Sequence, residues 1–156
     1  MGASVTSITS IRPKEFHFPL AVGWMGGRRV SAQVEGKPSI SVAPPTAFSG
    51  DDATTWSPED FFVAAAASCL AVTFTGIAER AGLEYEDLVV AADGICGQRP
   101  DGRFGFTGLS LRLELETADE DDEAEARKLA ERAEDTCLVA ASLDVPLQTD
   151  IVINGR

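Results

Sequence analysis

The chain has 156 residues, the size of one ordinary domain with a substantial hydrophobic core. It carries 25 acidic and 13 basic side chains, a formal net charge of −12, which argues against general binding to nucleic acid. A single His cannot build a His-rich metal site, and a Ser-His-Asp triad would have to use His17. Three Cys with no C-x-x-C pair and no signal-peptide pattern predict free thiols in a reducing, cytoplasmic compartment.

The first third of the chain is predicted to be extended. The stretch over 15–24 contains Pro19, which cannot donate to a β-ladder, so any strand there is expected at a sheet edge. The expected elements are a strand within 15–24, a turn at Gly26-Gly27, short strands over 29–34 and 39–43, and a loop over 44–56.

A long helix is predicted over residues 58–81. Ser57 is a natural N-cap, and Gly82 is a natural stop. Residues 61–78 carry no charge over 18 positions, which reaches the minimum length of a membrane span. The stretch is rich in Ala and contains Ser, Thr and Gly, so we interpret it as a buried helix of a soluble domain, with no membrane partner.

The rest of the chain predicts a hairpin, a helix and a strand, so the fold class is α+β. The leucines at 109, 111, 113 and 115 alternate with polar residues, whereas Phe104 and Phe106 have the opposite parity; we therefore expect a bulge near Gly108. The acidic run over 114–125 is interpreted as a solvated turn and helix start. The expected elements are strands over 88–96 and 103–116 with a turn at 99–102, a helix over 120–141 and a strand over 147–153.

Two of the three cysteines fall at positions where thiol chemistry is conceivable. Cys69 lies in the middle of the long helix, where it is either a buried, inert thiol or a reactive one. Apolar burial raises a thiol pKa and a mid-helix position gains nothing from the helix N-terminus, so a reactive Cys69 requires an outside cation; Arg28 is a better candidate than His17. Cys137 lies on the apolar stripe of the second helix, and Cys96 is expected in the core.

These residues resemble the motifs of the OsmC/Ohr family, the osmotically inducible and organic hydroperoxide resistance proteins. The run over 56–70 resembles the family's hallmark helix, with an Ala-rich stretch and Cys69 ten residues after Glu59. The Gly-Gly-Arg-Arg turn over 26–29 and the late Cys137 resemble two further family motifs. The resemblance implies one OsmC-like domain over residues 1–156, with residues 1–14 as an N-terminal extension.

The resemblance also implies a fold, a partner and an activity. The fold would be antiparallel sheets wrapped around two central helices in an intertwined homodimer. The activity would be that of a thiol-dependent peroxidase that reduces organic hydroperoxides to alcohols, with no bound cofactor or metal and an external dithiol reductant of the lipoyl or thioredoxin type. The implied roles are peroxidatic thiol for Cys69, resolving thiol for Cys137, activating cation for Arg28 (or Arg29 if the turn is offset), and positioning of that cation for Glu59.

Helix geometry adds a constraint, and the sequence also departs from the family pattern. Ten residues of straight helix span about 15 Å, so Glu59 reaches a Cys69 only if the helix is bent or the site is assembled between two chains. The family has Pro directly after its second Cys and Ser two positions later, whereas this chain has the run Leu-Val-Ala-Ala over 138–141. The departure supports an alternative, a non-catalytic OsmC-like dimer that binds a small apolar ligand and has inert cysteines.

Overall fold

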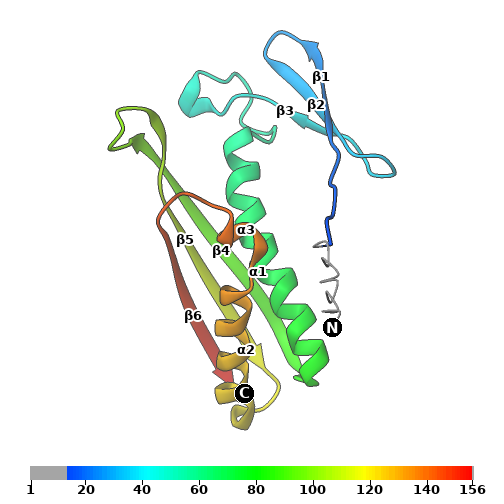
Figure 1. Ribbon diagram of the computed structural model, residues 1–156, viewed down its shortest axis with the longest axis vertical. Coiled ribbons are helices and arrows are strands. Elements are labelled where there is room, and N and C mark those ends of the chain that lie inside the picture. Colours follow the sequence, from blue (N-terminus) through cyan, green and yellow to red (C-terminus); the bar gives the residue numbers. More distant parts are fainter. Residues whose placement is uncertain (1–13, 156) are drawn as a thin grey trace, which may run out of the picture. The chain divides into compact units, whose positions relative to one another are not determined.

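The computed structural model describes residues 14–155, which form two compact units that divide between Val42 and Ala43. Residues 1–13 of the expected N-terminal extension lie outside the described residues. Both helices and strands are present, and the predicted α+β class is confirmed (Figure 1). Whether the two units act as one domain stays a prediction.

The N-terminal unit is a three-stranded antiparallel sheet in which β1 is an edge strand, as predicted, although β1 begins after Pro19 and does not contain it. The predicted turn is confirmed: Gly26 and Gly27 have φ of +116° and +54°, values that L side chains rarely adopt. The Trp24 indole N–H donates to the Gly27 carbonyl at 3.0 Å and closes the turn. The strands are β1 (Ala21–Gly26), β2 (Arg29–Gln33) and β3 (Ile40–Val42).

The long helix α1 spans Pro58–Ala81, with the predicted boundaries. The Ser57 hydroxyl accepts the Asp60 N–H at 3.0 Å, and the Asp60 carboxylate accepts the Ser57 N–H at 2.7 Å, which makes a capping box. Gly82 ends the helix with φ +71°. A short 3₁₀ helix, η1 (Thr46–Phe48), interrupts the loop that precedes α1.

By length and composition α1 could cross a membrane, since an 18-residue window has a mean hydropathy of 2.0. Its inner face instead forms part of a packed core with the neighbouring sheet and helix, where Leu70 and Phe74 are fully buried. This packing agrees with the interpretation of α1 as a core helix on that face. The expectation of a helix buried on every face is not met in the single chain, where Val72 on the outer face is 70% exposed.

The larger unit contains a second sheet of order β4-β5-β6, with β4 (Tyr85–Gln98), β5 (Phe104–Thr117) and β6 (Leu147–Gly155). Strands β4 and β5 form the predicted antiparallel hairpin, but β5 and β6 are parallel. The expectation of wholly antiparallel sheets is therefore wrong for this pair. The reason is topological: β6 follows a helical crossover, which returns the chain to the starting end of β5.

The predicted bulge near Gly108 is confirmed. Ile95 pairs with Gly108 and Cys96 pairs with Phe106, so Thr107 is the extra residue on β5. The bulge reverses the parity of the strand, and it thereby turns the Phe106 ring toward α1, where it stacks on Phe62 with ring centroids 4.1 Å apart.

The second predicted helix is interrupted. After a 3₁₀ turn, η2 (Glu120–Asp122), it divides into α2 (Glu123–Asp135) and a short α3 (Leu138–Ala141). The apolar stripe of α2 is buried as predicted, but the expectation of one helix to residue 141 is wrong. Thr136 ends α2: its hydroxyl donates to the Arg132 carbonyl at 2.7 Å, and Cys137 then adopts an extended backbone.

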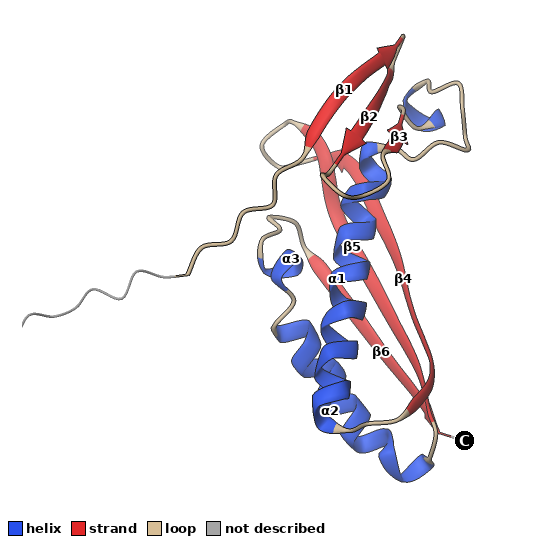
Figure 2. Ribbon diagram, turned by 90° about the vertical axis from the view of Figure 1, so that its right-hand side faces the viewer, coloured by secondary structure: helices blue, strands red, loops and turns tan. Residues whose placement is uncertain are grey.

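Helices α1 and α2 cover the same face of the second sheet, with α3 against α1 (Figures 1 and 2). The core between these layers is built from small and branched apolar side chains. Its fully buried members are Ala66, Leu70, Phe74, Ala78, Leu109, Leu111, Leu113, Leu115, Ala126, Ala130 and Ala133.

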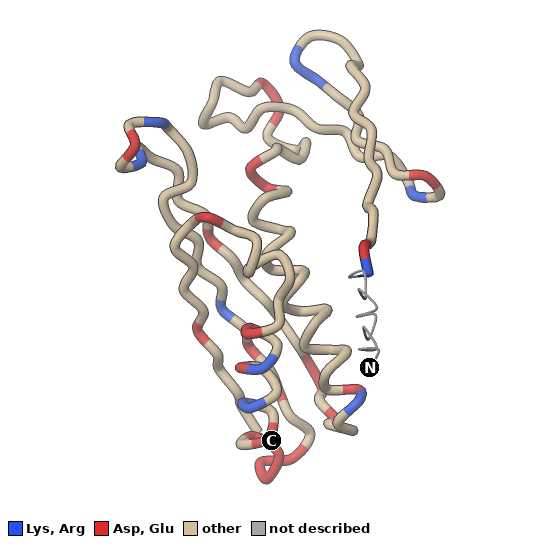
Figure 3. The backbone as a smooth tube through the Cα atoms, in the orientation of Figure 1, with Lys and Arg blue, Asp and Glu red and all other residues tan. Residues whose placement is uncertain are grey.

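Charges are distributed unevenly over the larger unit (Figure 3). The acidic run over 114–125 covers the end of β5, η2 and the start of α2, where most of its side chains are solvated, as predicted. Helix α1 carries charged residues only in its first and last turns. The long middle of α1 therefore presents neutral side chains on every face.

Gly94 is expected to be the least replaceable glycine between α1 and the sheet. An added Cβ would lie 2.6 Å from Val63 Cγ2 and 2.7 Å from the Phe106 ring. We expect Gly94→Ala to lower the free energy of unfolding by about 1–3 kcal/mol, because both neighbours must shift. Urea unfolding at fixed protein concentration measures this; Gly108→Ala, where no atom lies within 4 Å, is the matched control. Equal stability of the two variants would contradict the prediction.

Candidate active site

The structure brings Cys69 and Cys137 together between α1 and the start of α3. Cys69 is half-buried on α1, one helical turn before Thr73, and its sulfur lies 4.0 Å from the Thr73 hydroxyl. Cys137 is only 1% exposed, and its thiol lies close enough to the Cys69 sulfur to lower the pKa of Cys69. The two thiols therefore meet at one edge of the core.

The break between α2 and α3 makes this arrangement possible. Cys137 occupies the N-cap position of α3, with φ −66° and ψ 108°. The first N–H groups of any helix lack partners inside that helix, so Leu138 and Val139 have N–H groups free to bind a neighbouring acceptor. Both of them lie close enough to the Cys69 sulfur to lower its pKa.

The pKa of Cys69 is lowered below its ordinary value by these donors. Burial alone raises it, because an apolar surrounding disfavours the thiolate. The hydrogen bonds to the sulfur outweigh burial; in decreasing order they come from the Val139 N–H, the Cys137 thiol, the Thr73 hydroxyl and the Leu138 N–H. The sequence did not indicate these main-chain donors of α3, which lower the pKa of Cys69 without a cation. The need for an outside cation stays a prediction.

Cys137 has the opposite tendency. Burial raises the pKa of its thiol, and the negative charge of an ionised Cys69 raises it further. Of the two thiols, Cys69 is therefore the one that ionises more easily. This asymmetry distinguishes two thiols that the sequence alone leaves equivalent.

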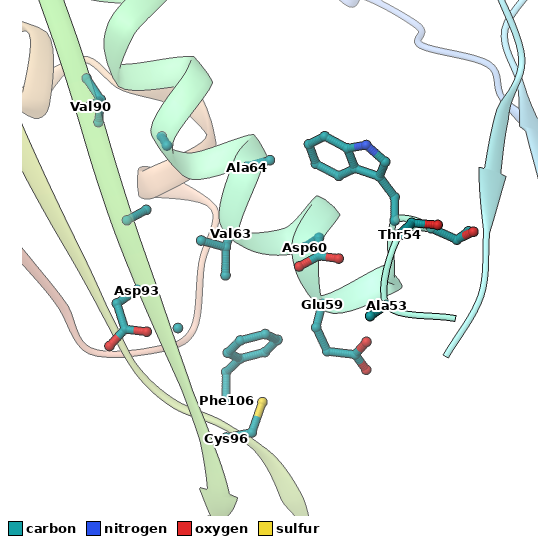
Figure 4. A pocket seen from close by; sticks show the side chains of 15 residues that line it. Ala53, Thr54, Glu59, Asp60, Val63, Ala64, Val90, Asp93, Cys96 and Phe106 are labelled. Carbon is teal, nitrogen blue, oxygen red and sulfur yellow. The ribbon is translucent and has the colours of Figure 1, made fainter. Parts of the chain in front are cut away.

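Glu59 lies in the first turn of α1, in a pocket of about 560 Å³ (Figure 4). The walls of this pocket come from α1, β4, Phe106 and the loop before α1. We call this the Glu59 pocket. Glu59 Oε2 is inaccessible to solvent and has no hydrogen-bond partner within the described residues. A buried carboxylate oxygen without a partner is costly, so the position calls for a cation or a donor. Glu59 does not contact Cys69 of its own chain, which agrees with their separation of about 15 Å along α1.

Cys96 lines the Glu59 pocket and is half-buried, so the expectation of a core position is wrong. Burial and the nearby charge of Glu59 both raise the pKa of its thiol. Cys96 is therefore held as a neutral thiol, in contrast to Cys69.

The two candidate arginines belong to the N-terminal unit. Arg28 lies in the turn between β1 and β2, and Arg29 is the first residue of β2. Which of them acts on a thiol stays a prediction. Within residues 14–155, no group of three or more His, Cys, Asp or Glu is placed to hold a metal ion.

Sequence reasoning missed several groups around the thiols. Thr73 could have been found, because the i, i+4 spacing places it on the same helix face as Cys69. The N–H groups of Leu138 and Val139 carry no such signal, since their role depends on a helix break that the apolar pattern does not indicate.

The architecture and the paired thiols define an α+β protein with a two-cysteine centre, and comparison with known proteins gives the family. The OsmC-like protein family model matches residues 50–151, and the chain belongs to that family. The uncharacterized protein YmaD of Bacillus subtilis is 29% identical over 150 residues, which cover 91% of this chain and 99% of YmaD.

Solved structures support the same fold. An OsmC-like protein of unknown function from Vibrio cholerae has a TM-score of 0.79 at 21% identity and covers 88% of this chain and 100% of its own. An organic hydroperoxide resistance protein from Elizabethkingia anophelis has a TM-score of 0.72 at 18% identity, with 93% and 100% covered. The OhrB organic hydroperoxide resistance protein of Bacillus subtilis has a TM-score of 0.62 at 19% identity, with 88% and 98% covered.

The Leu138 N–H provides a direct test of main-chain activation. Leu138→Pro removes this donor, and the extended Cys137 and first helical position both suit a proline. We expect the pKa of Cys69 to rise, so less thiolate is present at neutral pH and iodoacetamide alkylates Cys69 a few-fold more slowly. The rate profile should move to higher pH. Leu138→Ala, which keeps the N–H of this exposed residue, is the control; equal profiles for both variants would count against the donor role.

Proposed function

We propose that this protein is a thiol-dependent peroxidase that reduces organic hydroperoxides to alcohols. The observation that supports the proposal most strongly is the asymmetry of the thiol pair, in which Cys69 is ionised more easily and Cys137 is held protonated beside it. A thiolate is the nucleophile that peroxide reduction requires. The names of relatives as organic hydroperoxide resistance proteins agree with this substrate class.

The proposed first step is attack of the Cys69 thiolate on the terminal oxygen of the hydroperoxide. The O–O bond breaks, the alkoxide leaves and takes up a proton as the alcohol, and Cys69 becomes a sulfenic acid. The Val139 and Leu138 N–H groups stabilise the thiolate before the attack. Arg28, or Arg29 if the turn is offset, is proposed to add a positive charge, and Glu59 to position that arginine.

The proposed second step uses Cys137. Its sulfur attacks the Cys69 sulfenic sulfur, water leaves, and a Cys69–Cys137 disulfide forms. The existing contact between the two thiols supports this role without a large rearrangement. An external dithiol, of the lipoyl or thioredoxin type, then restores both thiols by exchange, and neither a bound cofactor nor a metal takes part. The proposed location is the cytoplasm, where such reductants keep thiols reduced.

A homodimer is part of the proposal. The face of α1 that points away from the sheet is formed by Phe61, Ala65, Ser68 and Val72, and Val72 is 70% exposed. The N-terminal unit likewise exposes Val22, Trp24 and Met25. Apolar surface of this extent is typical of a protein interface, and a second copy would also bring another Glu59 to each Cys69.

Thiol counting separates the peroxidase from the non-catalytic alternative with inert cysteines. One equivalent of cumene hydroperoxide should remove two of the three thiols per chain within minutes. Cys96→Ser should still lose two, Cys137→Ser should lose one and leave a dimedone-reactive sulfenic acid, and Cys69→Ser should lose none. If the reduced wild-type protein keeps all three thiols after the hydroperoxide is added, the proposed peroxidase activity is contradicted.

Complementation tests whether each site is shared between two chains. Glu59→Gln and Cys69→Ser chains with different tags are co-expressed, and the heterodimer is purified. If the Glu59 of one chain serves the Cys69 of the other, one site is intact, and we expect about half of the wild-type activity per dimer. If Glu59 serves its own chain, both sites are defective, and the heterodimer should be no more active than the Glu59→Gln homodimer.

A further inference from the structure

The Thr73 hydroxyl lies beside the Cys69 sulfur and has no part in the proposed reaction steps. The two residues are one turn apart on α1, their Oγ1 and Sγ atoms are separated by 4.0 Å, and either atom can be the hydrogen-bond donor. Both side chains are half-buried, at the border between the face of α1 that contains the buried Leu70 and the face that contains the exposed Val72. Thr73 is therefore placed to act on the sulfur rather than to fill the core.

This hydroxyl is not engaged by the main chain of its own helix. A Ser or Thr hydroxyl inside a helix can donate to a carbonyl of the preceding turn, and the hydroxyls of Ser68 and Thr75 do so at 2.6 and 2.9 Å. Within residues 14–155, the Thr73 hydroxyl has the Cys69 sulfur as its hydrogen-bond partner instead. A hydroxyl has a single hydrogen, so Thr73 has kept this hydrogen available for the thiolate.

A hydroxyl also differs from the other groups near the sulfur, because it can both donate and accept. The N–H groups at the start of α3 can only donate, and the Cys137 thiol is consumed when the proposed disulfide forms. The Thr73 hydroxyl can donate to the Cys69 thiolate, and it can donate to or accept from the S–OH group of a sulfenic acid. One side chain can thus remain bonded to Cys69 in both states.

We propose that Thr73 is a positioning residue whose hydroxyl holds the Cys69 sulfur beside Cys137, first as the thiolate and then as the sulfenic acid. The inference rests on the proposed function and adds a means of limiting over-oxidation at the same site. Thr73 and Cys137 both lie within reach of the sulfur, so a hydrogen bond from the hydroxyl is compatible with the approach of the second thiol.

The sulfenic acid on Cys69 has two competing fates. The Cys137 sulfur can attack it, which forms the disulfide and releases water. Alternatively, the sulfenic sulfur attacks a second hydroperoxide: a second S–O bond forms, the O–O bond breaks, the alkoxide leaves and is protonated, and Cys69 becomes a sulfinic acid that thiols do not reduce. A sulfur that is held toward Cys137 favours the disulfide.

The first test measures the pH dependence of alkylation of Cys69 by iodoacetamide. Thr73→Val removes the hydroxyl and nearly keeps the shape of the side chain, Thr73→Ser keeps the hydroxyl, and Thr75→Val is the matched control on the same helix. Loss of the donor should raise the pKa of the thiol. Thr73→Val should therefore react about three-fold more slowly below that pKa, and at nearly the wild-type rate above it. The other two variants should keep the wild-type profile.

The second test measures the fraction of Cys69 that becomes sulfinic acid in excess cumene hydroperoxide, by mass spectrometry. We expect this fraction to rise several-fold in Thr73→Val and to stay at the wild-type value in Thr73→Ser and Thr75→Val. The three proteins are compared at equal thermal stability, so that local unfolding does not expose the thiol.

An unchanged alkylation profile or an unchanged sulfinic fraction in Thr73→Val would overturn the inference. A Thr73→Ser variant that behaves like Thr73→Val would overturn it as well, because the hydroxyl would then not be the cause. If the wild-type protein loses no thiol to the hydroperoxide, the proposed function fails. In that case a shifted alkylation profile in Thr73→Val, with recovery in Thr73→Ser, would still support the role of the hydroxyl at the thiolate.

Discussion

The contact between Cys69 and the first turn of α3 is the interaction on which the candidate site depends. A thiol in the middle of a helix has its own main chain fully engaged in helical hydrogen bonds and cannot use it as a donor. Because α2 ends at Thr136, the N–H groups at the start of α3 lie close enough to the Cys69 sulfur to lower its pKa. The same break places Cys137 beside Cys69, so the proposed activation and the proposed resolution would share one structural cause.

Features of the fold that depend on one residue or on its near neighbours could be predicted from the sequence. The start and end of α1 follow from a capping Ser57 and a Gly82 with positive φ, and the bulge opposite Ile95 follows from a change of apolar parity along β5. Each of these features is determined by neighbours within a few positions. The α+β class and the burial of Cys137 followed from the same patterns.

Features that depend on contacts between distant segments could not be predicted from the sequence. The parallel direction of β6 depends on how the whole crossover packs, and no residue within β6 encodes it. The end of α2 at Thr136 is weakly signalled, because Ala-rich sequence on both sides favours helix. Cys96 was expected in the core because it lies on a strand beside a Gly, and that position does not indicate that a pocket opens there. The N–H groups near Cys69 depend on the end of α2, so the sequence did not indicate them either.

The two proposed means of stabilising the Cys69 thiolate differ in what they require. The Leu138 and Val139 donors belong to the same compact unit as Cys69 and need no assembly. An arginine positioned by Glu59 requires a second chain if α1 remains straight, because the helix keeps Glu59 about 15 Å from its own Cys69. The family places a proline after its second cysteine, and a proline has no N–H. With Leu138 at this position the chain has one more N–H group near the Cys69 sulfur. In the proposed mechanism the arginine would then be one of two sources of stabilisation for the thiolate, and the only positive charge near the peroxide oxygens.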